Sequence, residues 1–483
     1  EKQQIESRHE IVQGFIEQQE ISQYTHQALS NIIDIERVMA KIATEKISPR
    51  ALYQLQDSLG EVESLKIHLE KGSNLTIKDQ LKRLSPCSSI ITLIRETIHP
   101  EAPVLVSKGN VIAKGFSENL DALRSLRDQS KSHLDSMLER ETERSQIPSL
   151  KIAFNNVFGY YIEVRNTHKD KVPEDWIRKQ TLVNAERYIT EELKTFETEI
   201  LQAGDRILIL EHQLYAELIH KLQSDLEVLK QNANAVAQWD VLSCFAKTAL
   251  KNNYCRPKLT LGTELELKGA RHPVIEQHLP LGTPYIANDI KLDRETQQII
   301  MITGPNMSGK SAILRQTALI SLLAQLGSYV PATKATIGVV DKIFTRVGAS
   351  DNISMGASTF MVEMNETASI LNNISEHSLV LLDEIGRGTS TYDGISIALA
   401  IAEYLHEHPF RPKVLFATHY HELNEMTQRY VRIKNFNVSI KETNNSVLFL
   451  RKLIPGGSAH SFGIHVAKMA GIPQHVVRTA QEK

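Results

Sequence analysis

One stretch of the sequence has residue types and spacing that suit the binding of a phosphate chain. Residues 299–302 are apolar and predict a buried strand, and after Thr303 the sequence continues as Gly304-Pro305-Asn306-Met307-Ser308-Gly309-Lys310-Ser311. This arrangement of glycines, lysine and serine matches the pattern of a phosphate-binding loop. Residues 312–326 then carry apolar side chains at helical spacing, so strand, loop and helix occur in the order that this chemistry requires.

Each part of this loop has a separate task in holding a nucleotide. Glycines let backbone N–H groups surround the phosphate oxygens, and the start of the helix adds a partial positive charge. We expect Lys310 to reach the β- and γ-phosphates of ATP and the Ser311 hydroxyl to bind Mg²⁺. A chance match in a glycine-containing turn is the alternative, and the flanking strand and helix disfavour it.

Two further apolar strands end in residues that could act on the same nucleotide. Residues 379–384 end in Asp383 and Glu384, which could hold Mg²⁺ and polarise the attacking water. A strand that ends in solvated acids is the alternative. His419 ends residues 414–419, where a histidine can sense the γ-phosphate, although a lone histidine is more often structural. We therefore expect Asp383 to bind the metal, and Glu384, His419 and Lys310 to be catalytic.

Two other segments are candidates for contact with the nucleotide. Tyr285 and Ile286 precede the nucleotide strand, and Tyr285 could stack on an adenine, with packing in the core as the alternative. Ser358 and Thr359 stand at the predicted start of a helix, where hydroxyls and backbone N–H groups suit an anion. We expect this second anion-binding position to contact a phosphate held by another subunit.

Length and composition describe an ordinary globular protein. The 483 residues suggest about three domains, and the net charge of −2 excludes a generally basic nucleic-acid binder. The three cysteines have no metal-type spacing, which is typical of reduced thiols in the cytoplasm. No apolar run reaches membrane-spanning length, so we expect no membrane partner. The first residue, Glu1, falls within a helical pattern, so we expect further sequence upstream.

The pattern along the chain changes at two places. Residues 1–249 have mainly helical periodicity, interrupted at 150–188 by β-prone segments that predict a small antiparallel sheet. Residues 104–113 predict two short strands around a turn. From Pro257 the composition shifts to an α/β pattern. The β-prone insert has a net charge of +2, which favours contact with DNA only weakly, and a solvated surface is the alternative. The candidates for DNA contact are Lys151, Arg165, Lys169, Arg178 and Lys179.

Several longer motifs together make the sequence recognisable. It resembles the MutS family of bacterial mismatch-repair ATPases, and the resemblance covers essentially the whole chain. The matching motifs are TGPNMSGKS (303–311), ASTFMVEM (357–364), LVLLDEIGRGTSTYDG (379–394), FATHYHEL (416–423), FGYYIEV (158–164) and QTLVNAERY (180–188).

The resemblance implies a multidomain fold with helical and α/β parts. It places a long-helix core with lever arms at 1–127 and 191–256, and an antiparallel β clamp on the DNA backbone at 128–190. It implies an ABC-type P-loop ATPase at 257–454 and a helix-turn-helix dimerisation segment at 455–483.

The resemblance also implies a mechanism and partners. In this family two subunits, or a larger assembly, surround mismatched double-stranded DNA, and each completes its partner's ATP site through the loop that here holds Ser358 and Thr359. The family is a DNA-dependent ATPase that uses ATP and Mg²⁺, becomes a sliding clamp and recruits MutL. The implied location is the bacterial cytoplasm, at the nucleoid.

Two departures from the family pattern leave alternatives open. The mismatch-reading domain, with its Phe-x-Glu motif, and the connector domain after it are not found, so we expect this chain not to identify a mismatch unaided. Ser308 stands where many relatives carry glycine, and a small hydroxyl should be tolerated there. One alternative is a relative that clamps recombination junctions without reading mismatches. Another is a DNA tether in which ATP only stabilises the dimer.

Overall fold

The computed structural model of the chain describes residues 2–72, 74–155, 159–280, 282–305, 308–347, 359–443, 446–457 and 463–482. The chain divides into two compact units, which are described separately. Unit 1 comprises Glu1–Ser22, Asn74–Ile77 and Trp239–Lys483, and unit 2 comprises Gln23–Ser73 and Lys78–Gln238. Within the described ranges, no helix has both the length and the apolar character needed to cross a membrane.

Unit 2 is built mainly of helices, as the periodicity of its sequence predicts. Helix α4 starts with Pro49, and the Ser48 hydroxyl accepts a hydrogen bond from the N–H of Ala51, so the helix is capped at its first turn. The helices wholly or partly in this unit are α2 (Gln19–Ser30), α3 (Ile35–Ala43), α4 (Pro49–Glu70), α5 (Leu75–Leu81), α6 (Ser88–Thr97), α7 (Glu118–Asp128), α8 (Ser130–Ser145), α9 (Glu191–Gln223) and α10 (Leu226–Asn252).

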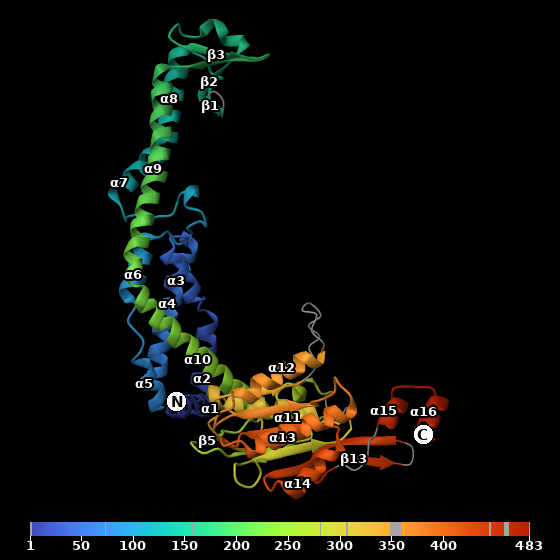
Figure 1. Cartoon of the computed structure of the whole chain (residues 1–483). Helices are drawn as coiled ribbons and strands as arrows, with labels where there is room; N and C mark the ends of the chain where they lie inside the picture. Colours follow the sequence, from blue (N-terminus) through green and yellow to red (C-terminus); the bar gives the residue numbers. More distant parts are fainter. Residues whose placement is uncertain are drawn as a thin grey trace. The chain divides into compact units, whose positions relative to one another are not determined.

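An antiparallel sheet lies beside the ends of α8 and α9 (Figure 1). Its strands run in the order β1-β2-β4-β3, which confirms the small sheet predicted from alternating apolar residues. Ile162, Val164, Trp176 and Tyr188 of this region pack with Met137 of α8. The elements are β1 (Lys151–Asn155), β2 (Gly159–Arg165), η2 (Asn166–Lys171), β3 (Ile177–Thr181) and β4 (Ala185–Ile189).

Residues 104–113 do not form the two strands that their sequence predicts. Val106–Lys108 forms a 3₁₀ helix, η1, and Gly109 follows it with a φ of 70°. The N–H of Val111 donates to the Glu211 carboxylate on α9 at 3.4 Å. Residues 111–113 also pair with residues 97–99 through an antiparallel bridge between Ile98 and Ile112, so segment 97–99 and α9 take the place of a hairpin partner.

Unit 1 contains two sheets. The larger has the order β10-β11-β12-β8-β13-β14, and all its pairs are parallel except β13 with β14. Its strands are β8 (Ile299–Thr303), β10 (Ile343–Arg346), β11 (Leu379–Asp383), β12 (Lys413–Ala417), β13 (Ile433–Thr443) and β14 (Ser446–Pro455). The smaller has the order β5-β9-β6-β7, with β5 (Lys258–Thr260), β6 (Leu265–Ala270), β7 (Asn288–Leu292) and β9 (Lys334–Gly338).

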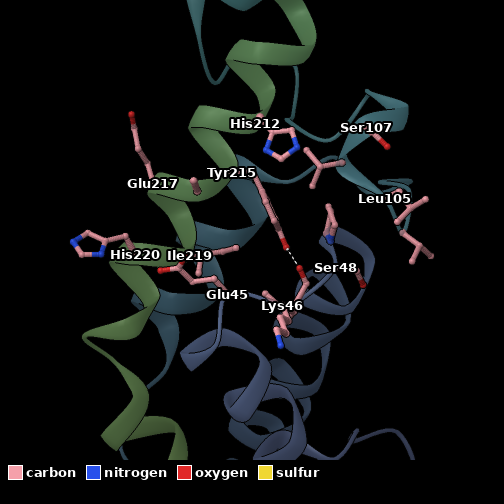
Figure 2. Close-up of a pocket in the computed structure, with 15 residues that line it drawn as sticks. Glu45, Lys46, Ser48, Leu105, Ser107, His212, Tyr215, Glu217, Ile219 and His220 are labelled. Carbon is pink, nitrogen blue, oxygen red and sulfur yellow. Dashed lines mark hydrogen bonds between the residues drawn. The ribbon is translucent and has the colours of Figure 1, made fainter.

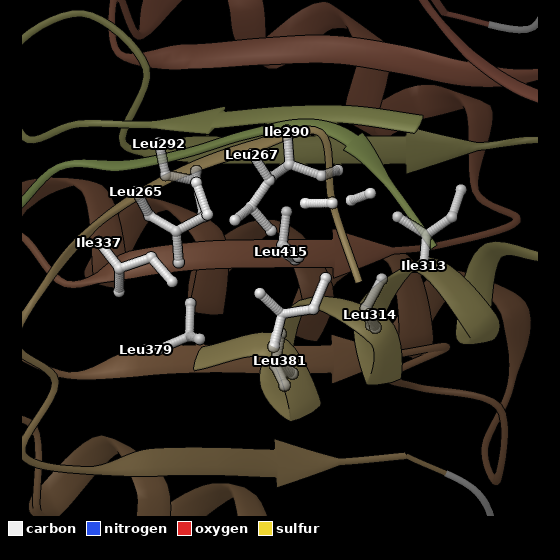
Figure 3. Packing of buried hydrophobic residues seen from close by; sticks show 14 of the residues in the cluster. Leu265, Leu267, Ile290, Leu292, Ile313, Leu314, Ile337, Leu379, Leu381 and Leu415 are labelled. Atoms are coloured by element: carbon white, nitrogen blue, oxygen red, sulfur yellow. The ribbon is translucent and has the colours of Figure 1, made fainter. Parts of the chain in front are cut away.

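The larger sheet is buried on both faces, which explains the continuous apolar runs of its parallel strands. On one face, Ile300 and Ile302 of β8 pack with α11 and the smaller sheet, whose side chains converge in Figure 3. On the other face, Ile299 and Met301 pack with α12 and α13. The remaining elements of this unit are α1 (Lys2–Glu17), η3 (Ile275–His278), α11 (Lys310–Leu326), α12 (Thr359–Asn372), α13 (Thr391–Glu407), η5 (His421–Glu425), α14 (Met426–Arg429), α15 (Gly463–Met469) and α16 (Gln474–Glu482).

Candidate nucleotide-binding site

The strand order of the larger sheet brings the predicted site residues to one edge. Strand β12 lies between β8 and β11, and all three are parallel, so their carboxyl ends meet at the same edge of the sheet. The phosphate loop leaves β8 there, Asp383 ends β11, and His419 follows β12 by two residues. Residues separated by more than a hundred positions in the sequence are therefore brought together.

Lys310 is the cation of this edge. Its side chain is 4% exposed, and its Nζ donates to the carbonyl oxygens of Gly304 at 2.5 Å and Pro305 at 3.2 Å. The same nitrogen lies 4.0 Å from Oε1 of Glu384. Burial lowers the pKa of Lys310, and the nearby carboxylates of Glu384 and Asp383 oppose that shift. Lys310 thus stands between the loop backbone and the two acids, as its predicted role requires.

The loop backbone depends on its two glycines. Gly304 and Gly309 have φ values of 140° and 104°, which L side chains rarely adopt. Ser308 is fully buried, and its hydroxyl has no hydrogen-bond partner among the described residues. Ser311 is half-buried in the first turn of α11. The two other predicted loop residues, Asn306 and Met307, lie outside the described residues.

Asp383 has the environment expected of a ligand to a cation. Its Oδ1 atom is buried and has no hydrogen-bond partner within the described part of the chain. A buried carboxylate oxygen without a partner is costly, and binding a cation removes that cost. The available donors are carboxylate and hydroxyl oxygens, from Asp383 and Ser311, and Mg²⁺ prefers oxygen ligands. These residues fit a magnesium ion bound together with phosphate oxygens.

Glu384 has a strained backbone. Its φ is +55°, in the left-handed region, and its N–H donates to the carbonyl of Ala417 at 2.8 Å. Such a conformation costs a non-glycine residue about 1–3 kcal/mol and is concentrated at active sites. Its Oε2 atom lies 2.6 Å from Nη1 of Arg387. The carboxylate thus lies between the cations of Lys310 and Arg387.

His419 lies at the same edge. Its pKa is lowered by burial first, and further by the positive charges of Arg387 and Lys310. Its Nδ1 atom is buried without a hydrogen-bond partner among the described residues. The imidazole is therefore neutral near pH 7, with a ring nitrogen still available for a ligand.

A cavity of about 270 Å³ adjoins the phosphate loop. Tyr285 and Ile286 line it together with Ser308 and Gly309, so the candidate adenine contacts border a pocket rather than a closed core. The Tyr285 hydroxyl donates to the side chain of Gln316 on α11 at 3.0 Å, and burial raises its pKa to about 12. The arrangement suits a base beside the phosphate loop.

Arg451 also lines this cavity, and sequence reasoning missed it. It belongs to β14, far along the chain from the loop, and has a φ of +54°. No motif marks the residue. Its place in the cavity wall and its strained backbone, which only the three-dimensional structure shows, mark Arg451 as a candidate.

Comparison with known proteins identifies the family. A model of MutS domain V matches residues 300–483, and a model of MutS family domain IV matches residues 115–206. The DNA mismatch repair protein MutS of Christiangramia forsetii is 60% identical over 478 residues, which are 99% of this chain and 55% of that protein. The chain belongs to the MutS family. The MutS proteins of Flavobacterium psychrophilum and Parabacteroides distasonis are 59% and 57% identical over the same shares of each chain.

The chain spans about half the length of these curated MutS relatives. The phosphate loop, Asp383, Glu384 and His419 all fall within the match to MutS domain V. Tyr285 and Ile286 lie upstream of that match, although they line the same cavity as the loop.

The segment expected to act on a partner subunit is described only in part. Thr359 is the first residue of α12 and is exposed. Ser358 lies outside the described residues. The predicted helix start is therefore confirmed at Thr359, and its role toward a second subunit stays a prediction.

The candidate DNA contacts all belong to unit 2 and to the match with MutS domain IV. All five side chains are exposed, and Arg178 forms an ion pair with Glu186 at 3.5 Å. For the other four, the described residues provide no ion-pair partner. These four lysine and arginine side chains are Lys151, Arg165, Lys169 and Lys179.

Unit 2 also has a larger cavity, of about 940 Å³, that contains none of the predicted site residues (Figure 2). It is lined by His212, Tyr215 and His220 of α9 and by Leu105, and the Tyr215 hydroxyl donates to the carbonyl of Ile47 at 2.8 Å. Cavity size therefore does not locate the predicted site residues, because Tyr285, Ile286, Ser308 and Gly309 line the smaller cavity of unit 1.

Proposed function

We propose that this chain is the ATP-hydrolysing and DNA-clamping part of a mismatch-repair protein. The observation that carries the proposal is the convergence of Lys310, the unpartnered Asp383 oxygen and the strained Glu384 at one sheet edge. Hydrolysis of ATP requires these three groups together: a cation for the phosphates, a ligand for the metal and a carboxylate for water. The relatives are named mismatch-repair proteins, which favours this function over the junction-holding alternative.

The residues of the site divide the work of hydrolysis. Lys310 and the loop N–H groups bind the β- and γ-phosphates. Lys310 then exchanges its contacts with the carbonyl oxygens of Gly304 and Pro305 for contacts with phosphate oxygens. Asp383 and Ser311 hold Mg²⁺, which neutralises charge on the phosphate oxygens when bound. Glu384 orients the attacking water and accepts its proton. Neutral His419 donates a hydrogen bond to the γ-phosphate, and Tyr285, Ile286 and Arg451 hold the base.

The same proposal covers the assembly. Two chains form a dimer around DNA, and the loop with Ser358 and Thr359 completes the partner's site. The β1–β4 region, within proposed clamp residues 128–190, contacts the DNA backbone, between core and lever segments 1–127 and 191–256. Residues 257–454 form an ABC-type ATPase domain, and the helix pair within 455–483 dimerises as a helix-turn-helix. ATP binding converts the dimer to a sliding clamp that recruits MutL, in the bacterial cytoplasm at the nucleoid.

Turnover of ATP per chain, measured against chain concentration with and without duplex DNA, tests this function. A site completed by a second subunit predicts a rise in turnover per chain as dimers form, and DNA is expected to change the rate. Constant turnover per chain, in a preparation that sedimentation shows to be monomeric, would contradict the shared site. Turnover that DNA leaves unchanged would instead favour a tether in which ATP only stabilises the dimer.

A further inference from the structure

A carboxylate on α12 reaches the backbone beside the proposed catalytic glutamate. Glu363 lies one turn after Thr359, and its side chain is buried. Its Oε1 atom accepts a hydrogen bond from the N–H of Gly386 at 2.6 Å. Gly386 is two residues after Glu384, in the loop that follows β11. A charged acceptor on one helix therefore holds the peptide that follows the strained residue.

The backbone of Gly386 is also fixed at its carbonyl group. Its carbonyl oxygen accepts the hydroxyl of Tyr420 at 3.0 Å, and Tyr420 is the neighbour of His419. Gly386 has a φ of +92°, and a Cβ atom there would lie 2.7 Å from the Cα of Gly394 on α13. No side chain fits at this close approach. The backbone of this one glycine thus joins α12, the loop after β11 and the loop after β12.

Arg346 of β10 balances the charge of Glu363. Its Nη2 atom lies 3.7 Å from Oε2 of Glu363, and its Nε atom lies 3.1 Å from Oε2 of Glu366. Glu363 is 6% exposed, whereas Glu366 is 44% exposed. Glu366 therefore shares the arginine, and no hydrogen bond to Gly386 is found for it within the described residues. This difference makes it a matched control.

Packing alone does not account for a buried carboxylate at this position. Replacing a buried ion pair by apolar side chains of similar volume is often neutral or stabilising, so Glu363 is not needed merely to fill space. A left-handed glutamate, by contrast, persists only where the surrounding structure holds it. The hydrogen bond from Gly386 supplies such a restraint two residues from Glu384.

We infer that Glu363 is a positioning residue, which through the Gly386 peptide holds Glu384 in its hydrolytic geometry. Glu363 lies on α12, the helix that begins at Thr359 and is proposed to reach the partner's nucleotide. Glu363 therefore links that helix to Glu384 of its own subunit. The inference rests on the proposed function. When α12 of one subunit contacts the nucleotide of its partner, Glu363 would transmit that contact to Glu384 and change the rate of hydrolysis at the first subunit's own site.

Steady-state hydrolysis and equilibrium ATP binding, measured on the whole chain, separate positioning from general damage. Glu363→Ala is expected to lower kcat about tenfold or more, because a hydrogen bond to a charged group is lost beside the catalytic residue, and to change the Kd for ATP less than about twofold. Glu363→Gln retains an acceptor and the side-chain volume, so it should restore part of kcat. Glu366→Gln should remain within about twofold of the unchanged chain.

Three results would overturn the inference: an unchanged kcat in Glu363→Ala, a loss confined to ATP affinity, or an equal loss of kcat in Glu366→Gln. Thermal unfolding reports whether each variant folds, and Glu363→Gln decides the question if the alanine variant does not. Absence of hydrolysis in the unchanged chain would instead reject the proposed function, so the two failures are distinguishable.

Mixed dimers test on which chain Glu363 acts. One chain carries Glu384→Gln and is silent, so all turnover comes from the site of the other chain. We expect Glu363→Ala to reduce turnover more when it is placed on the active chain than when it is placed on the silent chain. A larger loss when Glu363→Ala is on the silent chain would mean that the effect passes through the start of α12 at the partner's site, and positioning within the chain would be rejected.

Discussion

Glu384 and Arg387 form an ion pair directly after strand β11, with 2.6 Å between Oε2 and Nη1. The pair links the proposed water-activating carboxylate to a half-exposed arginine of the adjoining glycine-rich loop. The same arginine lowers the pKa of His419. A substitution at Arg387 should therefore change the electrostatic environment of both Glu384 and His419.

Arg387→Ala is expected to raise the pKa of His419 toward its ordinary value, because one of the positive charges that disfavour the imidazolium is removed. An NMR titration of the His419 ring measures this shift. Arg429→Ala, at the end of α14, removes another unit-1 arginine without this effect and serves as the control. A pKa of His419 that stays the same in Arg387→Ala would show that the charge of Arg387 does not contribute to the shift.

Tyr285 should contribute to ATP affinity through its ring. Tyr285→Ala is expected to weaken ATP binding about tenfold, since stacking on a base is worth about 1–3 kcal/mol. Tyr285→Phe retains the ring and loses only the hydrogen bond to Gln316, so its affinity should stay within a few-fold. Equilibrium binding of ATP to both variants measures the difference. Equal affinities for the two variants would place the base elsewhere.

The clamp candidates should act through charge. Removing both Arg165 and Lys179 is expected to reduce the slope of log K against log salt for duplex DNA by about 2, because about 0.9 counterions are released per phosphate contact. Arg144→Ala is the control, since Arg144 already pairs with Asp175 at 2.5 Å. Binding isotherms at several salt concentrations give the slopes. The same slope in the double variant and the unchanged chain would remove these residues from the DNA contact.

His9 should make unit 1 sensitive to acid. Burial first, and then the charge of Arg256, lowers the pKa of His9 from 6.5 to about 4. The unfolded chain therefore binds a proton below about pH 6.5 that the folded chain takes up only near pH 4, so stability falls as the pH falls through this window. The loss approaches about 3 kcal/mol at the lower end, as an order of magnitude.

Thermal unfolding of His9→Gln between pH 7.5 and 4.5 checks this prediction. The variant should lose less stability over that range than the unchanged chain, while His278→Gln, at an exposed position, should follow the unchanged chain. Parallel curves for His9→Gln and the unchanged chain would mean that other groups cause the acid sensitivity.

Local sequence predicts those parts of the site that the chain builds from neighbouring residues. The phosphate loop and the Asp383-Glu384 pair each lie within a few residues of a strand end, so motif and strand pattern together locate them. Their meeting at one edge follows once the strands are parallel.

The remaining features depend on contacts between distant segments. Arg451 reaches the cavity beside the phosphate loop from β14, and Glu363 meets Gly386 through the packing of α12, so neither position carries a local signal. The same reason explains the wrong prediction of strands at 104–113, where the backbone pairs with residues 97–99 and bonds to Glu211 of α9. Motifs thus identify the chemistry, and tertiary packing decides which other residues support it.

Glu384→Gln removes the proposed water-activating carboxylate, and ATP binding and ATP turnover are measured on the same preparation. The account predicts an ATP Kd within about twofold of the unchanged chain and turnover reduced by about a hundredfold or more, because general-base catalysis contributes at least that much. Glu376→Gln, an exposed carboxylate just before the other end of β11 that pairs with Arg294 at 2.7 Å, should leave both quantities unchanged. Undiminished turnover in Glu384→Gln would contradict the account.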